Sequence, residues 1–207
     1  MQGRDFRISS LAKGDIDTVV EIHQREALSH LRVLMEKLYK RNPQEWKKGG
    51  QASLDASVAR IFDYGTWQFD ELGCKTGADC IHLSFREDFQ GDRVLAFVAG
   101  LGSMVMASYD DKKEFFILDD LDPQGLYNSA RNVEIAVWQL SNKRTSKGNL
   151  FLLSNEATGE VHNLSFEREF GKLIADQDTL AQIIADKTNR SISRIIQTMA
   201  TAVFLPI

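Results

Sequence analysis

The most constraining feature of this sequence is an uncharged apolar run that extends from residue 94 to residue 107. A helix that spans a bilayer needs about 20 apolar residues, so this run is too short to cross a membrane as a helix. Small residues recur within it four positions apart, as in the pairs Ala96 and Gly100, and Ala99 and Ser103. Such spacing lets neighbouring helices approach closely. The run therefore predicts a central buried helix, and a membrane-inserting hairpin is the alternative.

Helical periodicity continues on both sides of this run, where apolar residues recur at steps of three and four. Asp15 is the expected N-cap of the first helix, and Pro43 marks its end because the residue before a proline is pushed out of the helical region. Asp122 followed by Pro123 is typical of a helix start. Residues 81–89 also alternate as a strand would, and we favour a helix there. The predicted helices cover residues 15–42, 54–62, 81–89, 94–107, 122–140 and 166–203.

The last of these helices raises a problem of length. About 40 helical residues at a rise of about 1.5 Å would span roughly 60 Å, which exceeds a compact domain of this size. Its apolar stripe slips in phase near Lys187, so we expect a bend or break at residues 187–189, with both halves buried against residues 94–107 and the Asp122 helix. The alternative is a helix that projects from the domain as an interaction surface. The side chains expected in the core are Phe166, Phe170, Leu173, Leu180, Ile184, Ile195 and Met199.

Together these patterns predict a mainly α fold, namely a multi-helix bundle around a buried central helix rich in small residues. Residues 150–153 and 160–162 flank a polar turn and predict one short β-hairpin. We expect a polar lead-in or tether at residues 1–13, followed by a single helical domain over residues 14–207.

Charge and motif content narrow the function classes. The 207 residues include 25 Lys and Arg against 29 Asp and Glu, a net charge of −4, which argues against a nucleic-acid partner. The sequence has no Gly-x-Ser-x-Gly nucleophile motif and no phosphate-binding Gly-x-x-x-x-Gly-Lys loop. We therefore expect no cofactor, and the lack of these motifs favours a non-enzymatic role.

The two cysteines, Cys74 and Cys80, lie close together in a glycine-containing stretch. In an exported protein they are expected to form a disulfide, whereas in a cytosolic protein they would be free thiols. A zinc site would need two further ligands from distant residues, because no second cysteine pair exists.

His23, Glu26 and His30 are the candidate metal ligands or acid–base groups. They are three and four residues apart on the first helix, so they lie on roughly one side of it. His23 also falls on the apolar stripe, where a hydrogen-bonded core histidine is the alternative. A carboxylate brought towards His23 by the last helix would favour an acid–base site.

The Asp122 helix carries a second stripe, formed by Tyr127, Arg131, Glu134 and Trp138, so we expect it to pack on more than one side. A polar cluster overlaps this stripe and more readily forms an intrahelical pair or a buried network than a catalytic group. Its members are Asn128, Arg131, Asn132 and Glu134.

Residues 32–48 are unusually basic, with six basic and two acidic side chains. Such runs commonly form a solvated face, and aromatic residues within this one could instead support contact with a partner or with lipid headgroups. The candidate interaction surface consists of Tyr39, Lys40, Arg41, Trp46, Lys47 and Lys48.

Three strings carry a family resemblance. They are LYKRNP at residues 38–43, LDPQGLYNSARN at residues 121–132, and AVFLP at residues 202–206. Together they resemble a family of proteobacterial proteins that are predicted to be exported and are often lipoproteins. The resemblance implies a cell-envelope location but no activity, so it assigns no functional residue.

The start of the chain departs from that family, because Met1, Gln2 and Gly3 form neither a signal peptide nor a lipid-accepting cysteine. If Met1 stands in place of such a cysteine, the polar residues that follow would tether the domain to a membrane through a lipidated N-terminus.

Three functional hypotheses follow. The first is a non-enzymatic helical protein that faces the periplasm, is lipid-tethered to the envelope and binds a protein or envelope component. The second is a metal-dependent or acid–base enzyme with its site on the first helix. The third is a cytosolic partner-binding helical module, which predicts reduced Cys74 and Cys80.

Overall fold

The computed structural model describes residues 14–73, 76–116, 119–156, 163–195 and 198–207, and it is mainly α-helical, as the sequence predicts. No strand occurs in these residues, although single antiparallel bridges join Arg144 to Leu150 and Glu156 to Asn163. The helices are α1 (Asp15–Arg41), α2 (Pro43–Lys48), α3 (Leu54–Phe62), η2 (Asp70–Leu72), α4 (Gly77–Ser84), α5 (Arg93–Ala107), α6 (Pro123–Asn142), α7 (Ser165–Thr188) and η3 (Met199–Thr201).

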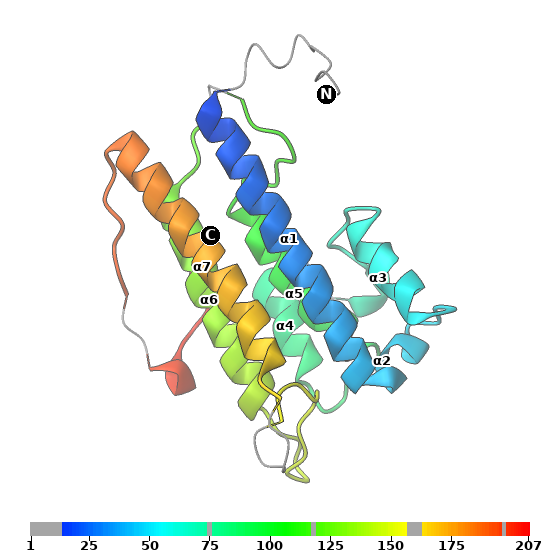
Figure 1. The fold of residues 1–207 in the computed structure, drawn as a ribbon. Coiled ribbons are helices and arrows are strands. Elements are labelled where there is room, and N and C mark those ends of the chain that lie inside the picture. Colours follow the sequence, from blue (N-terminus) through cyan, green and yellow to red (C-terminus); the bar gives the residue numbers. More distant parts are fainter. Residues whose placement is uncertain (1–13, 74–75, 117–118, 157–162, 196–197) are drawn as a thin grey trace.

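The long helices form a bundle. In Figure 1, α1, α7 and α6 run alongside one another, with α7 in contact with both of the others. α5 packs behind α1 and holds α4 against its own far side, while α2 and α3 lie near the end and flank of α1 away from α7. This arrangement places α5 at the centre of the molecule.

α5 is the predicted central helix, and its residues from Val94 to Met106 are all buried. Its small residues allow close helix contact, as the four-residue spacing suggests. A Cβ atom at Gly100 would lie 2.6 Å from the carbonyl oxygen of Gly77 on α4, so only glycine fits there. Gly102 faces the ring of Trp67 in the same way. None of the described helices combines the length and apolar content that a membrane span requires.

Two predicted helix boundaries need correction. Gly14, and not Asp15, is the N-cap of α1, because the carboxylate of Asp17 accepts a 2.6 Å hydrogen bond from the Gly14 N–H. The helix favoured over residues 81–89 ends earlier, at Ser84, and its N-cap is Thr76. The break predicted at Pro43 is confirmed, because α1 ends at Arg41 and α2 begins at Pro43.

The break predicted near residues 187–189 occurs at Asn189, whose left-handed φ of 52° ends α7. Leu173 and Leu180 on α7 are fully buried, as expected. The described residues after Asn189 do not continue the helix as expected. They are irregular apart from η3, and the Ile195 side chain is 42% exposed. Packing of Ile195 in the core was therefore a wrong expectation. α7 packs mainly against α6 and α1 rather than α5.

Two further expectations fall partly or wholly outside the described residues. The lead-in at residues 1–13 is one of them. The predicted β-hairpin includes residues 160–162, which are also outside. In the described chain around it, Leu150 forms a single bridge with Arg144, and Glu156 forms one with Asn163.

Burial of α7 predicts that Leu180→Ala destabilises the protein by about 2–5 kcal/mol, because it removes a fully buried side chain and leaves a cavity. Ile195→Ala, which changes a side chain that is 42% exposed, is the control and should cost less than about 1 kcal/mol. Chemical denaturation measures both values. Equal effects of the two substitutions would contradict the boundary drawn at Asn189.

Candidate functional site

Three carboxamide side chains on α6 form a row that holds the end of the chain. Gln124, Asn128 and Asn132 are spaced by four residues, so they lie one above another on the same helix face. We call this row the carboxamide ladder, and we call residues 190–195 and 198–207 the C-terminal segment. Figure 1 shows this segment leaving α7, turning at η3 and returning towards the bundle. The ladder and the segment make up the candidate site.

The ladder binds the main chain of the C-terminal segment. The Leu205 N–H donates to Asn132 Oδ1 at 2.7 Å, and Asn132 Nδ2 donates back to the Leu205 carbonyl at 2.9 Å. Gln124 makes the same pair with Ser193, at 2.8 and 3.2 Å. A carboxamide carries one acceptor and one donor side by side, so it satisfies both backbone groups of a single residue.

Asn128, the middle residue of the ladder, binds both the C-terminal segment and its neighbour Gln124. Asn128 Nδ2 donates to the Pro206 carbonyl at 2.8 Å, while its Oδ1 accepts from Gln124 Nε2 at 2.8 Å. Asn132 is fully buried, so loss of its amide would leave backbone groups of the segment without partners. These contacts specify backbone geometry and not side-chain identity.

Side chains of the segment add apolar contacts around the ladder. The ring of Phe204 packs edge-on against His82 of α4, with 5.4 Å between the ring centroids. Beside it lies a pocket of about 480 Å³ between the start of α4, α5 and the chain end, where Gly77, Met104 and Ile207 are among the lining residues. The segment therefore joins α4, α5 and α6.

The sequence had placed Asn128 and Asn132 in a polar cluster with Arg131 and Glu134. The intrahelical pair is confirmed, because Arg131 Nη2 lies 3.1 Å from Glu134 Oε1, and it also contacts Asp178 of α7 at 2.6 Å. The role of the two asparagines was missed. The available signal was the repeat of amides at every fourth residue from Gln124.

The metal-ligand candidates are not brought together around one point. His23 Nδ1 lies 2.6 Å from Asp176 Oδ1, and His30 Nδ1 lies 3.1 Å from Glu169 Oε2, both carboxylates belonging to α7. Glu26 points to solvent. No group of three or more potential ligands is close enough to hold a metal ion in the described part of the chain. The two histidines instead link α1 to α7.

The two carboxylates differ in their environment. Burial raises the pKa of Asp176, and its Oδ2 atom is buried with no hydrogen-bond partner in the described structure. Burial acts the same way on Glu169, but hydrogen bonds from Lys172 and His30 outweigh it and lower the pKa of Glu169. Glu169 thus has two hydrogen-bond partners, His30 and Lys172, where Asp176 has His23.

Only some residues of the candidate interaction surface are exposed to solvent. Tyr39 is buried at 1% exposure, so its inclusion was wrong. Arg41 forms an ion pair with Glu156, and Lys48 forms one with Glu45. The exposed side chains that remain from this set are those of Lys40, Lys47 and Lys48, with Trp46 half-buried beside them.

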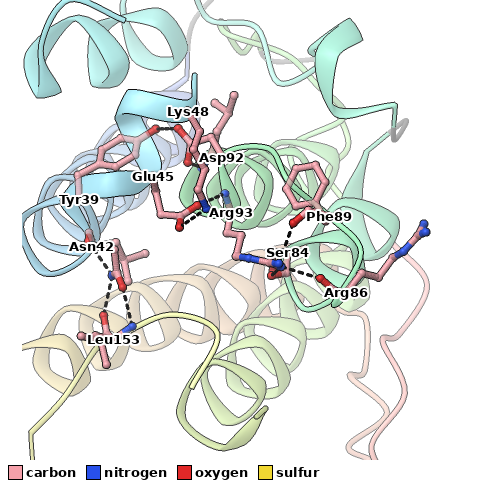
Figure 2. Close-up of polar contacts among 12 residues, drawn as sticks. Tyr39, Asn42, Glu45, Lys48, Ser84, Arg86, Phe89, Asp92, Arg93 and Leu153 are labelled. Atoms are coloured by element: carbon pink, nitrogen blue, oxygen red, sulfur yellow. Dashed lines mark hydrogen bonds and ion pairs between the residues drawn. The ribbon is translucent and has the colours of Figure 1, made fainter. Parts of the chain in front are cut away.

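A buried polar cluster lies beneath this surface, at the start of α5 (Figure 2). The Tyr39 hydroxyl donates to Asp92 Oδ2 at 2.8 Å, and Asp92 Oδ1 caps α5 by accepting the Leu95 N–H. Glu45 accepts the Arg93 N–H, so a second carboxylate faces the same helix end. The cluster thus ties α1 and α2 to α5.

Arg93 extends this cluster towards α4. Its guanidinium donates to the carbonyl oxygens of Ser84, Arg86 and Phe89, which closes the turn between α4 and α5 (Figure 2). A pocket of about 280 Å³ opens beside Asp92, with Arg60 on its wall. Because Arg60 is paired with Glu71, the pocket offers no unpaired positive charge there.

Burial raises the pKa of Asp92 to about 6, although hydrogen bonds from Leu95 and Tyr39 oppose the shift. Burial and the nearby Asp92 carboxylate raise the pKa of Tyr39 well above its ordinary range, so its hydroxyl stays protonated and acts as a donor. Both titratable groups therefore serve helix capping and packing.

The cysteine pairing stays a prediction. Cys80 is buried on α4, whereas Cys74 lies outside the described residues.

Comparison with known proteins gives no relative: the chain matches no family model, and no curated protein or solved structure is significantly similar to it. The site must therefore be interpreted from its own geometry.

Asp92 gives a testable pH dependence. Its pKa is about 6 in the folded protein against 3.8 as the ordinary value, so the folded state binds the extra proton between these pH values. The free energy of unfolding should then fall as the pH rises through this window, by on the order of 3 kcal/mol from this group. Asp92→Asn keeps the cap and should lack this decline.

Denaturant unfolding at pH 4, 5, 6 and 7 measures the difference between wild type and variant. The control is Asp55→Asn, which changes an exposed carboxylate of α3. A difference that stays constant over the series for Asp92→Asn would show that the carboxyl titrates normally.

Proposed function

We propose that this chain is a non-enzymatic helical protein of the cell envelope that binds a non-helical segment of a partner protein along the carboxamide ladder. One observation carries the proposal: Gln124 and Asn132 each bind both backbone groups of one residue, and Asn128 binds a third carbonyl. Main-chain recognition of this kind is what sheet edges provide when they capture peptides.

The C-terminal segment of the chain occupies the ladder as an internal ligand. It is held by side-chain amides and by the contact between Phe204 and His82, and only partly buried side chains such as Ile192 and Phe204 pack against the hydrophobic core. Val203 is 73% exposed, so the segment buries only part of its apolar surface. A partner segment with similar backbone geometry and better apolar contacts could replace it at little cost.

Sequence features support the location. The resemblance to exported proteins and the closely spaced Cys74 and Cys80 both favour an oxidising compartment. A lipidated N-terminus would hold the domain at the periplasmic face of a membrane, where its ligand would be an envelope protein. If the chain is instead a cytosolic partner-binding module, it would bind its partner along the same ladder but in a different compartment.

An acid–base enzyme is the second candidate, favoured by the 2.6 Å contact between His23 and Asp176. A carboxylate that orients a histidine in this way is typical of a general base. This candidate predicts an activity that His23→Gln abolishes in a folded protein. If the contact only joins α1 to α7, His23→Gln lowers stability and a hydrolase screen finds no activity in wild type.

A labelled peptide corresponding to residues 198–207 tests the proposed function. Leu205→Pro in the full chain removes the N–H that Asn132 accepts, so it loosens the chain's own segment and leaves the ladder intact. We expect the peptide to bind this variant about tenfold more tightly than wild type, since the competing internal ligand has lost one buried hydrogen bond. Fluorescence anisotropy measures the affinity.

Adding Asn132→Ala to Leu205→Pro should abolish the gain, because the ladder loses its buried amide. Gln182→Ala is the matched control, since it removes an exposed amide of α7 that donates a hydrogen bond to Asp186 of the same helix. Equal peptide affinity in wild type, in Leu205→Pro and in the double variant would refute the proposal.

The compartment has its own test. Non-reducing mass spectrometry of freshly isolated native protein should find Cys74 and Cys80 joined, with both thiols resistant to alkylation until a reductant is added. Two alkylatable thiols in the native protein would favour the cytosolic module instead.

A further inference from the structure

The second stripe of α6, which the proposed function does not use, faces two adjoining pockets. Tyr127 and Arg131 line a pocket of about 330 Å³, and Trp138 lines another of about 400 Å³. Glu134 and Met199 belong to both linings, so the pockets meet at these residues. The stripe therefore lies along two adjoining pockets, which we together call the groove. We propose that the groove binds a single-chain amphiphile with an anionic head group, of the fatty-acid class.

The walls of the groove suit an acyl chain. Ile135, Ile195 and Leu205 contribute apolar side chains to the first pocket, so the C-terminal segment forms one of its sides. Val137 and Ile174 do the same for the second pocket, between α6 and α7. Both pockets fall within the size range of ligand sites, about 300–1,000 Å³.

The length of the groove also suits a chain and not a compact ligand. The lining residues extend along α6 from Tyr127 to Asn142. At about 1.5 Å per residue this stretch of helix is roughly 22 Å long, which accommodates an extended acyl group.

The charged side chains of the groove determine which way the amphiphile lies and which charge its head group carries. Arg194 lines the first pocket and has no ion-pair partner among the residues that the structure describes. Arg131 is already engaged, since its guanidinium contacts both Asp178 and Glu134. An anionic head group would therefore be placed at Arg194, beside Tyr127, with the chain directed towards Trp138.

The junction of the two pockets carries an ion-paired carboxylate. Burial raises the pKa of Glu134, although Arg131 opposes the shift. A cationic head group is not needed there, because Arg131 already neutralises the carboxylate. The acyl chain would pass this paired group and reach the second pocket.

The chain itself offers a substitution that fills the second pocket without a clash. Gly171 of α7 lines that pocket, and a Cβ atom built on it meets no other atom within 4 Å. Gly171→Leu should therefore place its side chain in the groove while favouring the helix. Ala175→Leu, at an exposed position of the same helix, is the matched control.

Titration calorimetry of the full chain with octanoate, decanoate and dodecanoate, each below its micelle concentration, tests the proposal. We expect saturable binding that tightens up to about fourfold for each added methylene group. Gly171→Leu should weaken dodecanoate binding at least tenfold, and Ala175→Leu should not. Arg194→Gln should weaken dodecanoate and leave dodecanol unchanged, whereas Arg190→Gln, at a residue paired with Asp120, should affect neither.

The position of the bound chain is tested with a fatty acid that carries bromine at its methyl end. Bromine quenches tryptophan on contact, so the emission of Trp138 should fall, and Trp138→Phe should remove this quenching while Trp46 and Trp67 continue to emit. The proposal is overturned if binding is absent or not saturable, if a cationic amphiphile of equal chain length binds as tightly, or if Gly171→Leu and Trp138→Phe change nothing.

Discussion

Burial of α5 on all sides is the constraint on which the rest of the structure depends. A helix without a charged or strongly polar face can be stabilised only if other elements cover it completely. The contact between Gly100 and the carbonyl of Gly77 brings α4 against one side, and α1 and α6 cover others. The backbone groups of α5 that have no partner within the helix then lie at its two ends. Asp92 and Glu45 supply acceptors at the start, even though burying Asp92 raises its pKa.

Among the residues that the structure describes, the bundle around this helix offers no sheet edge that could bind an irregular segment. Carboxamide side chains bind the backbone of such segments instead. Asn42, just after α1, binds both backbone groups of Leu153 at 2.8 and 2.9 Å, which repeats the geometry of Asn132 with Leu205 (Figure 2). Buried backbone groups require partners, and a single amide side chain supplies both. The same solution thus serves a connecting loop and the C-terminal segment.

The sequence was sufficient for the elements whose pattern is local. Periodicity located α1, α3, α5 and α6, and the phase slip near Lys187 located the end of α7. It failed beyond that point, where Ile195 and Met199 continue the helical spacing although the chain is no longer part of α7. The continued spacing does not by itself decide between a helix and a segment that packs back on α6.

The candidate site was beyond the reach of local patterns for a related reason. The ladder joins residues that are about seventy positions apart, such as Asn132 and Leu205, and no periodicity connects them. The strings at residues 121–132 and 202–206, which carry the family resemblance, prove to be in contact through this pair. The histidine pairs are similar, since Asp176 and Glu169 reach His23 and His30 only once α7 has packed on α1.

The ladder and the groove share the C-terminal segment, and this has an energetic consequence for the two proposals. Leu205 is bound by Asn132 through its backbone and lines the first pocket through its side chain. An amphiphile in that pocket would gain contacts only while the segment is in place, so it would stabilise the segment on α6. By thermodynamic reciprocity, a partner that displaces the segment would weaken amphiphile binding by the same factor. The two ligands would therefore oppose each other through a single element, without any change in the helical bundle.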